Sequence, residues 1–229
     1  MENAMAWDHD SQDADELPGV RAVAKRRRAD TYRLLADVFN AEPTAEMLDS
    51  LRRPEAARAF EALGAAFATE LDRMEAELGK DGMVEELACE YARLFIGPGK
   101  HVGPYESLHR DDYPLGHWGP STAEVKRFIE HHGLGYQEGF QGMPDHIAAE
   151  FQFMAELASA EAEAVERGKD AEAIQARQIQ RVFHAEHISR WVPTFCDKVI
   201  EIAEFDFFRD FARMSKALCE IDAATFGPG

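Results

Sequence analysis

Apolar residues recur every three or four positions through most of the chain, and this spacing constrains the fold more than any other feature. The stretch from 55 to 78 shows it most clearly, with apolar side chains at Ala56, Phe60, Leu63, Phe67, Leu71, Met74 and Leu78. Such spacing places them on one face of an α-helix. Alternating patterns typical of strands are scarce. The sequence therefore predicts an all-α protein with roughly eight to ten helices.

Composition limits the kinds of partner that we expect. The chain has 229 residues, enough for one domain or for two closely packed half-domains, and 45% of them are hydrophobic. Its formal net charge of -18 repels nucleic acid and anionic lipid, so we expect neither as a partner. A cationic peptide, protein or metal ion suits this surface better, although the charge could also serve only solubility. Residues 1–20 read as an acidic disordered tail.

The cysteines and the apolar runs point to the cytoplasm. The three cysteines lie far apart without a Cys-x-x-Cys pair, which supports neither a zinc site nor a disulfide framework and fits a reducing compartment. No apolar run approaches the roughly 20 residues that cross a bilayer. The run after Arg28 is interrupted by Asp30, Arg33 and Asp37, so it predicts a first amphipathic helix rather than an export signal.

A long segment, "GPGKHVGPYESLHRDDYPLGHWGP" (97–120), interrupts the helical pattern. It is rich in glycine and proline, so no regular element is expected there. A loop of this length in a helical protein is usually functional or disordered. The aromatic residues Tyr105, Tyr113 and Trp118 argue against disorder.

The stretch "GMPDHIAAEFQFMAEL" (142–157) begins the next helix after a glycine-rich connector. Pro144 suits a position at or just before the first helical residue. Asp145 is expected in the first turn, where it can accept backbone N–H bonds. His146 and Glu150 are four residues apart and can pair. The stretch therefore reads either as a capped core helix or as part of a functional site.

A catalytic or metal site is the alternative reading of these polar residues. Helical di-iron proteins need two Glu-x-x-His motifs and two further glutamates, whereas Glu106–His109 is the only such motif here and lies in the loop. His184 and His187 can share a helix face, but a third metal ligand is missing. A helical metal-dependent enzyme remains an alternative, and it would use His146, Glu150, Glu106 and His109. A purely structural subunit of a larger complex is a third possibility.

Three segments together resemble one known family. "YARLFIGPGKHVGPYES" is similar to the Tyr-x-x-Leu-Phe … Pro-Tyr-Glu-Ser signature of the TorD/DmsD family of redox-enzyme maturation chaperones. "MPDHIAAEFQFMAEL" resembles that family's Pro-Asp-His-Ile helix start, and "FHAEHISRWVPTFCDKV" its His-x-x-x-Trp-x-Pro-x-Phe segment. The resemblance spans about residues 22 to 222.

The resemblance implies two packed helical halves, residues 21–133 and 145–229, joined by a hinge at 134–144. Members are cytoplasmic, take part in anaerobic respiration and are not enzymes. They bind the twin-arginine leader and the folding chain of a molybdenum enzyme, and delay its export until the molybdopterin guanine dinucleotide cofactor is inserted. No cofactor of the chaperone itself is implied. Weak guanine-nucleotide binding is associated with the family, and members occur as monomers or as half-exchanged dimers.

A twin-arginine leader has a cationic segment followed by an apolar segment, so its receptor needs carboxylates beside an apolar groove. We place this groove between Pro104–Ser107 and the start of the Pro144 helix. The leader arginines are expected to meet carboxylates, namely Asp145, Glu106 and Glu150. The apolar part is expected to be lined or supported by Tyr91, Tyr105, Phe153 and Trp191. Tyr91 and Trp191 also suit core positions, Ser107 could only cap its turn, and His146 could order the hinge.

Overall fold

Helices account for nearly all of the structure that the computed structural model describes, namely residues 18–53, 56, 66–97, 100–110, 119–133 and 142–227. The α-helices are α2 (Pro18–Asn40), α3 (Ala45–Leu51), α5 (Phe67–Tyr91), α6 (Pro120–His131), α7 (Ile147–Glu166), α8 (Asp170–Phe183), α9 (Ser189–Ile202) and α10 (Asp206–Phe226). Over these ranges the only β pairing is one isolated bridge. The all-α prediction is confirmed. The acidic tail up to residue 17, hinge residues 134–141, Tyr113 and Trp118 lie outside the described residues.

Helices α8 and α9 form one continuous run. A π-helical turn, His184–Ile188, joins them without a break. The sequence instead suggested two separate helices, one over about 170–187 and one from Trp191 with Pro193 in its first turn. In the structure Pro193 lies inside α9, just after the π-helical turn, a type of insertion that helices tolerate as a single turn. With this run counted once, the described ranges hold seven α-helices, slightly fewer than the predicted eight to ten, and α5 is kinked at Gly79, where φ is 75°.

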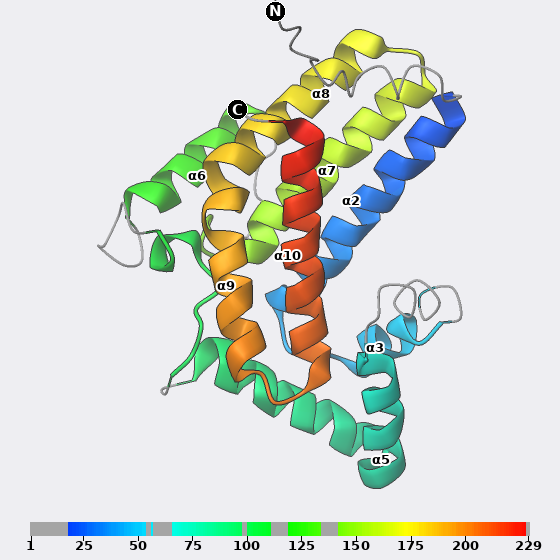
Figure 1. Ribbon diagram of the computed structural model, residues 1–229, viewed down its shortest axis with the longest axis vertical. Helices are drawn as coiled ribbons and strands as arrows, with labels where there is room; N and C mark the ends of the chain where they lie inside the picture. The colour runs from blue at the N-terminus through cyan, green and yellow to red at the C-terminus, as the bar shows by residue number, and fades with distance from the viewer. Residues whose placement is uncertain are drawn as a thin grey trace, which may run out of the picture.

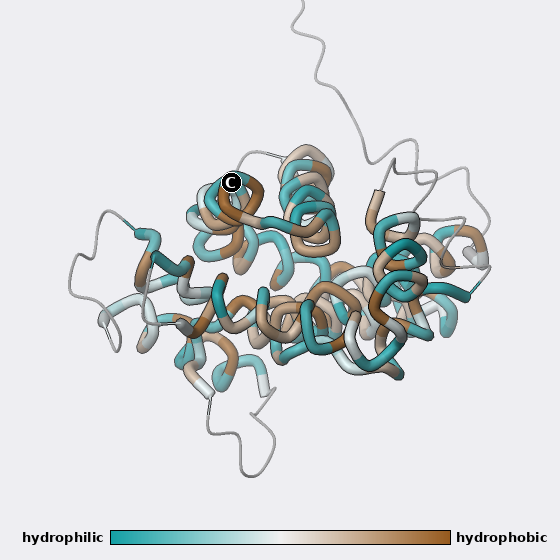
Figure 2. Tube along the Cα trace, turned by 90° about the horizontal axis from the view of Figure 1, so that it is seen from below, coloured by the Kyte–Doolittle hydropathy of each residue, from teal (hydrophilic) through white to brown (hydrophobic). Residues whose placement is uncertain are grey.

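The helices enclose a single large core. Helix α2 lies alongside α7, α8 packs on the other side of α7, and α9 and α10 run side by side, with α5 across one end of the bundle (Figure 1). Hydrophobic and hydrophilic stretches alternate along the helical trace, as amphipathic helices require (Figure 2). The core cluster includes residues from both predicted halves, such as Phe39, Phe95, Phe151, Trp191 and Phe208. The division at residues 134–144 stays a prediction.

A network of buried polar groups fixes α2 against α8 and α10. The guanidinium of Arg28 donates to both oxygens of Asp222, at 2.7 and 2.5 Å, and also to Gln180. The Tyr32 hydroxyl donates to the same carboxylate at 2.5 Å. Burial, with the neighbouring Asp222 carboxylate, raises the pKa of Tyr32 well above its usual value, so Tyr32 stays a donor. These bonds join segments that are almost 200 positions apart in the chain.

Replacing Asp222 by alanine is therefore expected to destabilise the protein strongly. The side chain of Asp222 is only 1% exposed, and its loss leaves Arg28 and Tyr32 without their acceptor. The expected loss in the free energy of unfolding is about 3 kcal/mol, measured by urea denaturation. Glu77→Ala, which removes the partner of Arg73 on the exposed face of α5, serves as control and should cost less than about 0.5 kcal/mol. Equal losses in the two variants would contradict a structural role of this network.

Candidate functional site

One antiparallel bridge connects the 100–110 loop to the start of α7. The Glu106 N–H donates to the Asp145 carbonyl at 2.9 Å, and the Ile147 N–H donates to the Pro104 carbonyl at 2.9 Å. This pairing places Pro104–Ser107 beside Pro144–His146, the two segments between which the sequence predicted a groove; the groove itself stays a prediction. We refer to this contact, Pro104–Ser107 with Pro144–His146, as the junction. Two backbone hydrogen bonds hold its bridge together.

Helix α7 begins at Ile147, slightly later than predicted. His146 is the N-cap, and its Nδ1 accepts the Ala148 N–H at 3.1 Å. Burial lowers the pKa of His146 to about 4, so the ring is neutral at pH 7 and can accept this bond. Asp145 therefore precedes the helix instead of lying in its first turn, and the expected pairing of His146 with Glu150 is absent. The Asp145 carboxylate accepts the Ser107 N–H across the junction at 3.0 Å.

Three acidic side chains gather in the interior behind the junction. Glu106, Asp145 and Glu150 are all fully buried. Glu106 is bound by Arg110 Nη1 at 2.7 Å and by His187 Nδ1 at 2.9 Å. Glu150 accepts the Trp191 indole N–H at 3.0 Å. We refer to Glu106, Asp145 and Glu150 as the carboxyl cluster.

Burial raises the pKa of Glu150 well above its usual value, and the nearby charges of Glu106 and Asp145 act in the same direction. At neutral pH Glu150 is therefore expected to hold its proton. A neutral Glu150 avoids placing a further negative charge in a region of low dielectric constant. Within the cluster, Glu106 is the member that binds Arg110 and His187.

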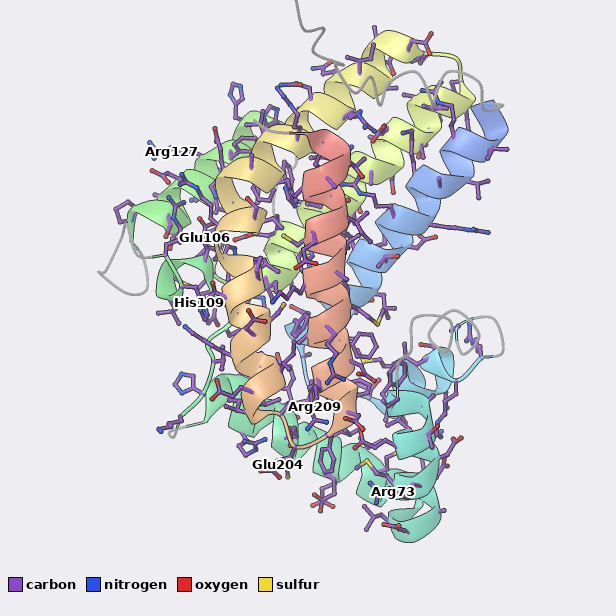
Figure 3. All side chains as sticks on the ribbon, in the orientation of Figure 1. Arg73, Glu106, His109, Arg127, Glu204 and Arg209 are labelled. Carbon is purple, nitrogen blue, oxygen red and sulfur yellow. The ribbon has the colours of Figure 1, made fainter. Side chains whose placement is uncertain are left out.

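His109 ties the loop to α9. Its Nε2 donates to the Gly103 carbonyl at 2.8 Å, its Nδ1 accepts from Lys198 at 3.2 Å, and its ring stacks on Trp191 at 5.6 Å. Figure 3 shows Glu106 and His109 beside α9. In the described ranges no group of three or more His, Cys, Asp or Glu side chains is placed to hold a metal ion. Both ring nitrogens of His109 are thus engaged in contacts within the fold.

Not all predicted site residues meet at the junction. Pro104, Tyr105, Glu106, Ser107, Pro144, Asp145, His146, Glu150 and Trp191 lie at or directly behind it. Tyr91 donates its hydroxyl to the Phe39 carbonyl at 2.9 Å and packs on Phe95, which is a core position. Phe153 packs on Phe183 at 4.7 Å and on Phe128 at 6.0 Å, which is also a core position.

Sequence reasoning missed two residues of the site. Arg110 is four positions after Glu106, a spacing that favours an ion pair, yet the segment showed no helical pattern to suggest it. His187 belongs to the His-x-x-x-Trp segment, but the sequence named no partner for it, whereas in the structure it binds Glu106. Only the fold, which brings the π-helical turn onto the loop, reveals this contact.

Three buried oxygen atoms at the junction have no hydrogen-bond partner within the described part of the chain. They are Oδ1 of Asp145, Oε1 of Glu150 and Oγ of Ser107. Most buried polar atoms in proteins are paired, and an unpaired one costs about 1–3 kcal/mol. Oδ1 of Asp145 is an acceptor that a donor from a ligand can meet, whereas Oε1 of Glu150 becomes such an acceptor only when Glu150 ionises, because the protonated group is itself a donor toward Glu106.

The chain is all-helical in its described ranges, and its sequence motifs resemble those of the redox-enzyme maturation chaperones. Residues 55–197 match the model of the nitrate reductase delta subunit family, and the chain belongs to this family. It is 27% identical over 214 residues to the chaperone protein TorD of Shewanella loihica, covering 89% of this chain and 95% of that protein. It is 26% identical over 205 residues to the chaperone protein TorD of Vibrio vulnificus strain YJ016, covering 86% and 93%. The predicted family is confirmed.

The comparisons support a redox-enzyme maturation chaperone as the class of function, since these relatives are named as chaperones and not as enzymes. None of the described helices is both long enough and apolar enough to cross a membrane.

The raised pKa of Glu150 predicts how stability depends on pH. A carboxyl whose pKa is raised by folding stabilises the protein fully below its unfolded value, near 4.5, and this contribution is lost as the pH rises toward the folded value. Glu150→Gln removes the ionisation but keeps an acceptor for Trp191. We expect the variant to equal or exceed the parent in stability at pH 8, with the difference shrinking toward pH 4.5, as measured by urea denaturation.

Glu163→Gln, at an exposed site on the same helix, is the control and should leave the pH profile of the parent unchanged. If Glu150→Gln instead lost more than about 1 kcal/mol at pH 8, Glu150 would be an ionised partner in the folded state.

Proposed function

We propose that this protein is a cytoplasmic chaperone, without enzymatic activity, that binds the twin-arginine leader and the apo form of a molybdopterin-dependent oxidoreductase. It assists insertion of the cofactor into this client and delays export until the client is mature. Family membership and the chaperones among its relatives support the class. A monomer or half-exchanged dimer, and weak guanine-nucleotide binding, stay predictions from the resemblance.

The observation that carries the proposal is the unpaired acceptor of Asp145 at the junction, with the Glu150 carboxyl group directly behind it. Oδ1 of Asp145 is buried without a donor, and Oε1 of Glu150 becomes a second such acceptor when Glu150 ionises. An arginine guanidinium carries five N–H donors in a planar fork that matches carboxylates. A leader arginine would supply these donors, and its positive charge would favour ionisation of Glu150.

Access to the carboxyl cluster requires the junction to open. The carboxyl groups are fully buried, so a leader cannot reach them in this conformation. Two backbone hydrogen bonds close the bridge, each with a net stability of only about 1 kcal/mol. We propose that the leader replaces this bridge and that its arginines pair with Asp145, Glu106 and Glu150. The entropic cost of ordering the leader is offset by the hydrogen bonds that its N–H donors form with the unpaired oxygens.

Aromatic and apolar groups flank the bridge and suit the apolar part of a leader. Tyr105 and His146 are half-buried, and their rings contact edge to face at 5.0 Å. Leu108, three residues along the loop, is 37% exposed. Trp191 lies beneath the loop, and Phe153 and Tyr91 support the core behind it. We propose that Tyr105 and Leu108 contact the leader directly, whereas Trp191, Phe153 and Tyr91 position these contacts.

Binding of a twin-arginine leader is expected to be specific for arginine. Calorimetry should compare a leader peptide from an oxidoreductase of the same genome with its twin-lysine version. The lysine ammonium cannot form the bidentate contact, so we expect affinity to fall by about tenfold or more, and binding of the arginine peptide to weaken with added salt. Equal affinity for the two peptides, or no binding of any leader encoded near the gene, would overturn the proposal.

Asp145→Asn tests the role of the unpaired oxygens. We expect leader affinity to fall by about tenfold, because the amide lacks the charge that meets the guanidinium. Stability should change by about 1 kcal/mol or less, since the Asn oxygen can still accept the Ser107 N–H. Asp170→Asn, in the first turn of α8, is the matched control and should leave leader binding intact. A collapse in stability without a specific loss of binding would show that Asp145 only holds the junction.

A further inference from the structure

A second hollow lies beside the carboxyl cluster, between α6 and the π-helical turn that joins α8 to α9. Its volume is about 650 Å³. We refer to it as the α6 pocket, and its lining residues are Arg110, Glu124, Arg127, Phe128, His131, His132, Glu186, His187 and Arg190. The leader hypothesis makes no use of this pocket.

The lining of the α6 pocket differs in charge from the rest of the molecule. It contains three arginines and three of the nine histidines of the chain, against two glutamates. The whole protein has a net charge of -18. A local group of arginines on such an acidic protein is the place where an anion meets the least repulsion.

Two of the lining side chains form a buried base to the pocket. Arg110 and His187 are 7% and 3% exposed, and both bind Glu106, which fixes their positions. Arg110 also lies 3.8 Å from Glu124. The base is therefore preorganised by the same glutamate that belongs to the carboxyl cluster.

The walls carry further cations and one aromatic ring. Arg127 projects from α6, on the same side of the molecule as Glu106 (Figure 3). Its Nε donates to the Ala123 carbonyl at 3.1 Å, and in the described part of the chain no carboxylate lies within 4 Å of its guanidinium. The Phe128 ring packs between His132, at 4.8 Å, and His187, at 5.9 Å. The walls thus combine guanidinium groups with a flat apolar surface.

We propose that the α6 pocket binds a small organic anion that carries phosphoryl or carboxylate groups. The volume lies within the range of roughly 300–1,000 Å³ typical of small-molecule sites, and it is much larger than a single inorganic ion needs. Arg127 and Arg190 bind the anionic groups, Arg110 and His187 form the base, and Phe128 contacts the body of the ligand. Glu124 and Glu186 restrict the site to ligands whose charge is concentrated at one end.

The test uses the full chain and two probes, pyrophosphate and citrate, titrated by calorimetry at constant ionic strength. We expect saturable binding of at least one probe, and the stronger probe identifies phosphoryl or carboxylate as the preferred group. Arg127→Gln and Arg190→Gln should each weaken it by about tenfold, the effect expected for losing one charge-assisted contact. Arg73→Gln, an exposed arginine on α5 at a distance from the pocket, should leave binding unchanged (Figure 3).

The proposal is overturned if neither probe binds saturably, or if Arg73→Gln weakens binding as much as the pocket variants. Thermal denaturation of each variant shows whether it remains folded, and Arg127→Lys provides a second variant that keeps the charge but loses the planar fork. The Arg127 variants should still bind a twin-arginine leader. Failure of the anion site and failure of the proposed leader site are therefore separate outcomes.

Discussion

The burial of the Glu106 carboxyl group is the constraint on which the functional region depends. A buried carboxylate is costly unless charged and hydrogen-bonding partners surround it. Arg110 supplies one partner from the same loop, and His187 supplies the other from the π-helical turn between α8 and α9. Through this one side chain the 100–110 loop is attached to an element 81 positions further along the chain. The loop can then stay ordered although its only regular element is the short 3-10 helix Glu106–Leu108, where the sequence predicted none.

The partners of Glu106 also determine what its neighbours can do. Arg110 and His187 both bind Glu106. Glu150 instead accepts a hydrogen bond from the neutral indole of Trp191. Asp145 is engaged through one oxygen by a backbone N–H. Oδ1 of Asp145 and Oε1 of Glu150 are buried and have no hydrogen-bond partner among the described residues. Glu106 is thus fully paired in this conformation, whereas Asp145 keeps one oxygen that can accept a hydrogen bond and Glu150 gains one on ionisation. This division explains how acidic residues of one cluster can differ in role.

Much of the fold could be predicted from the sequence because helical periodicity depends on neighbouring residues. The stripe from Phe67 to Met74 is buried as predicted, and Thr44 caps α3 through its side chain. The continuity of α8 and α9 could not be predicted, since a proline at position 193 usually signals a break and the π-helical turn has no clear sequence signal. The boundary of α7 was missed by two residues, because His146 is an uncommon N-cap that accepts through its ring nitrogen.

The sequence indicated which segments lie close together, but not which side chains contact one another there. The motifs around Glu106 and Asp145 indicated that the loop and α7 belong to one region, and the bridge between Tyr105 and His146 joins them. Burial of the carboxyl groups depends on side chains from α9 and from the π-helical turn, which are distant in sequence.

The two proposed sites share Glu106, and this shared residue has a thermodynamic consequence. A leader arginine that binds Glu106 would compete with Arg110, which forms the base of the α6 pocket. An anion in the pocket would attract Arg110 and weaken its hold on Glu106. The leader would therefore release Arg110 for the anion, and the anion would release Glu106 for the leader. Each ligand would then strengthen the binding of the other. Because such coupling is reciprocal, the same factor must describe the effect of the leader on the anion and of the anion on the leader. A cation and an anion bound on opposite sides of one buried ion pair also leave its total charge balanced, so neither needs to place an uncompensated charge in the interior.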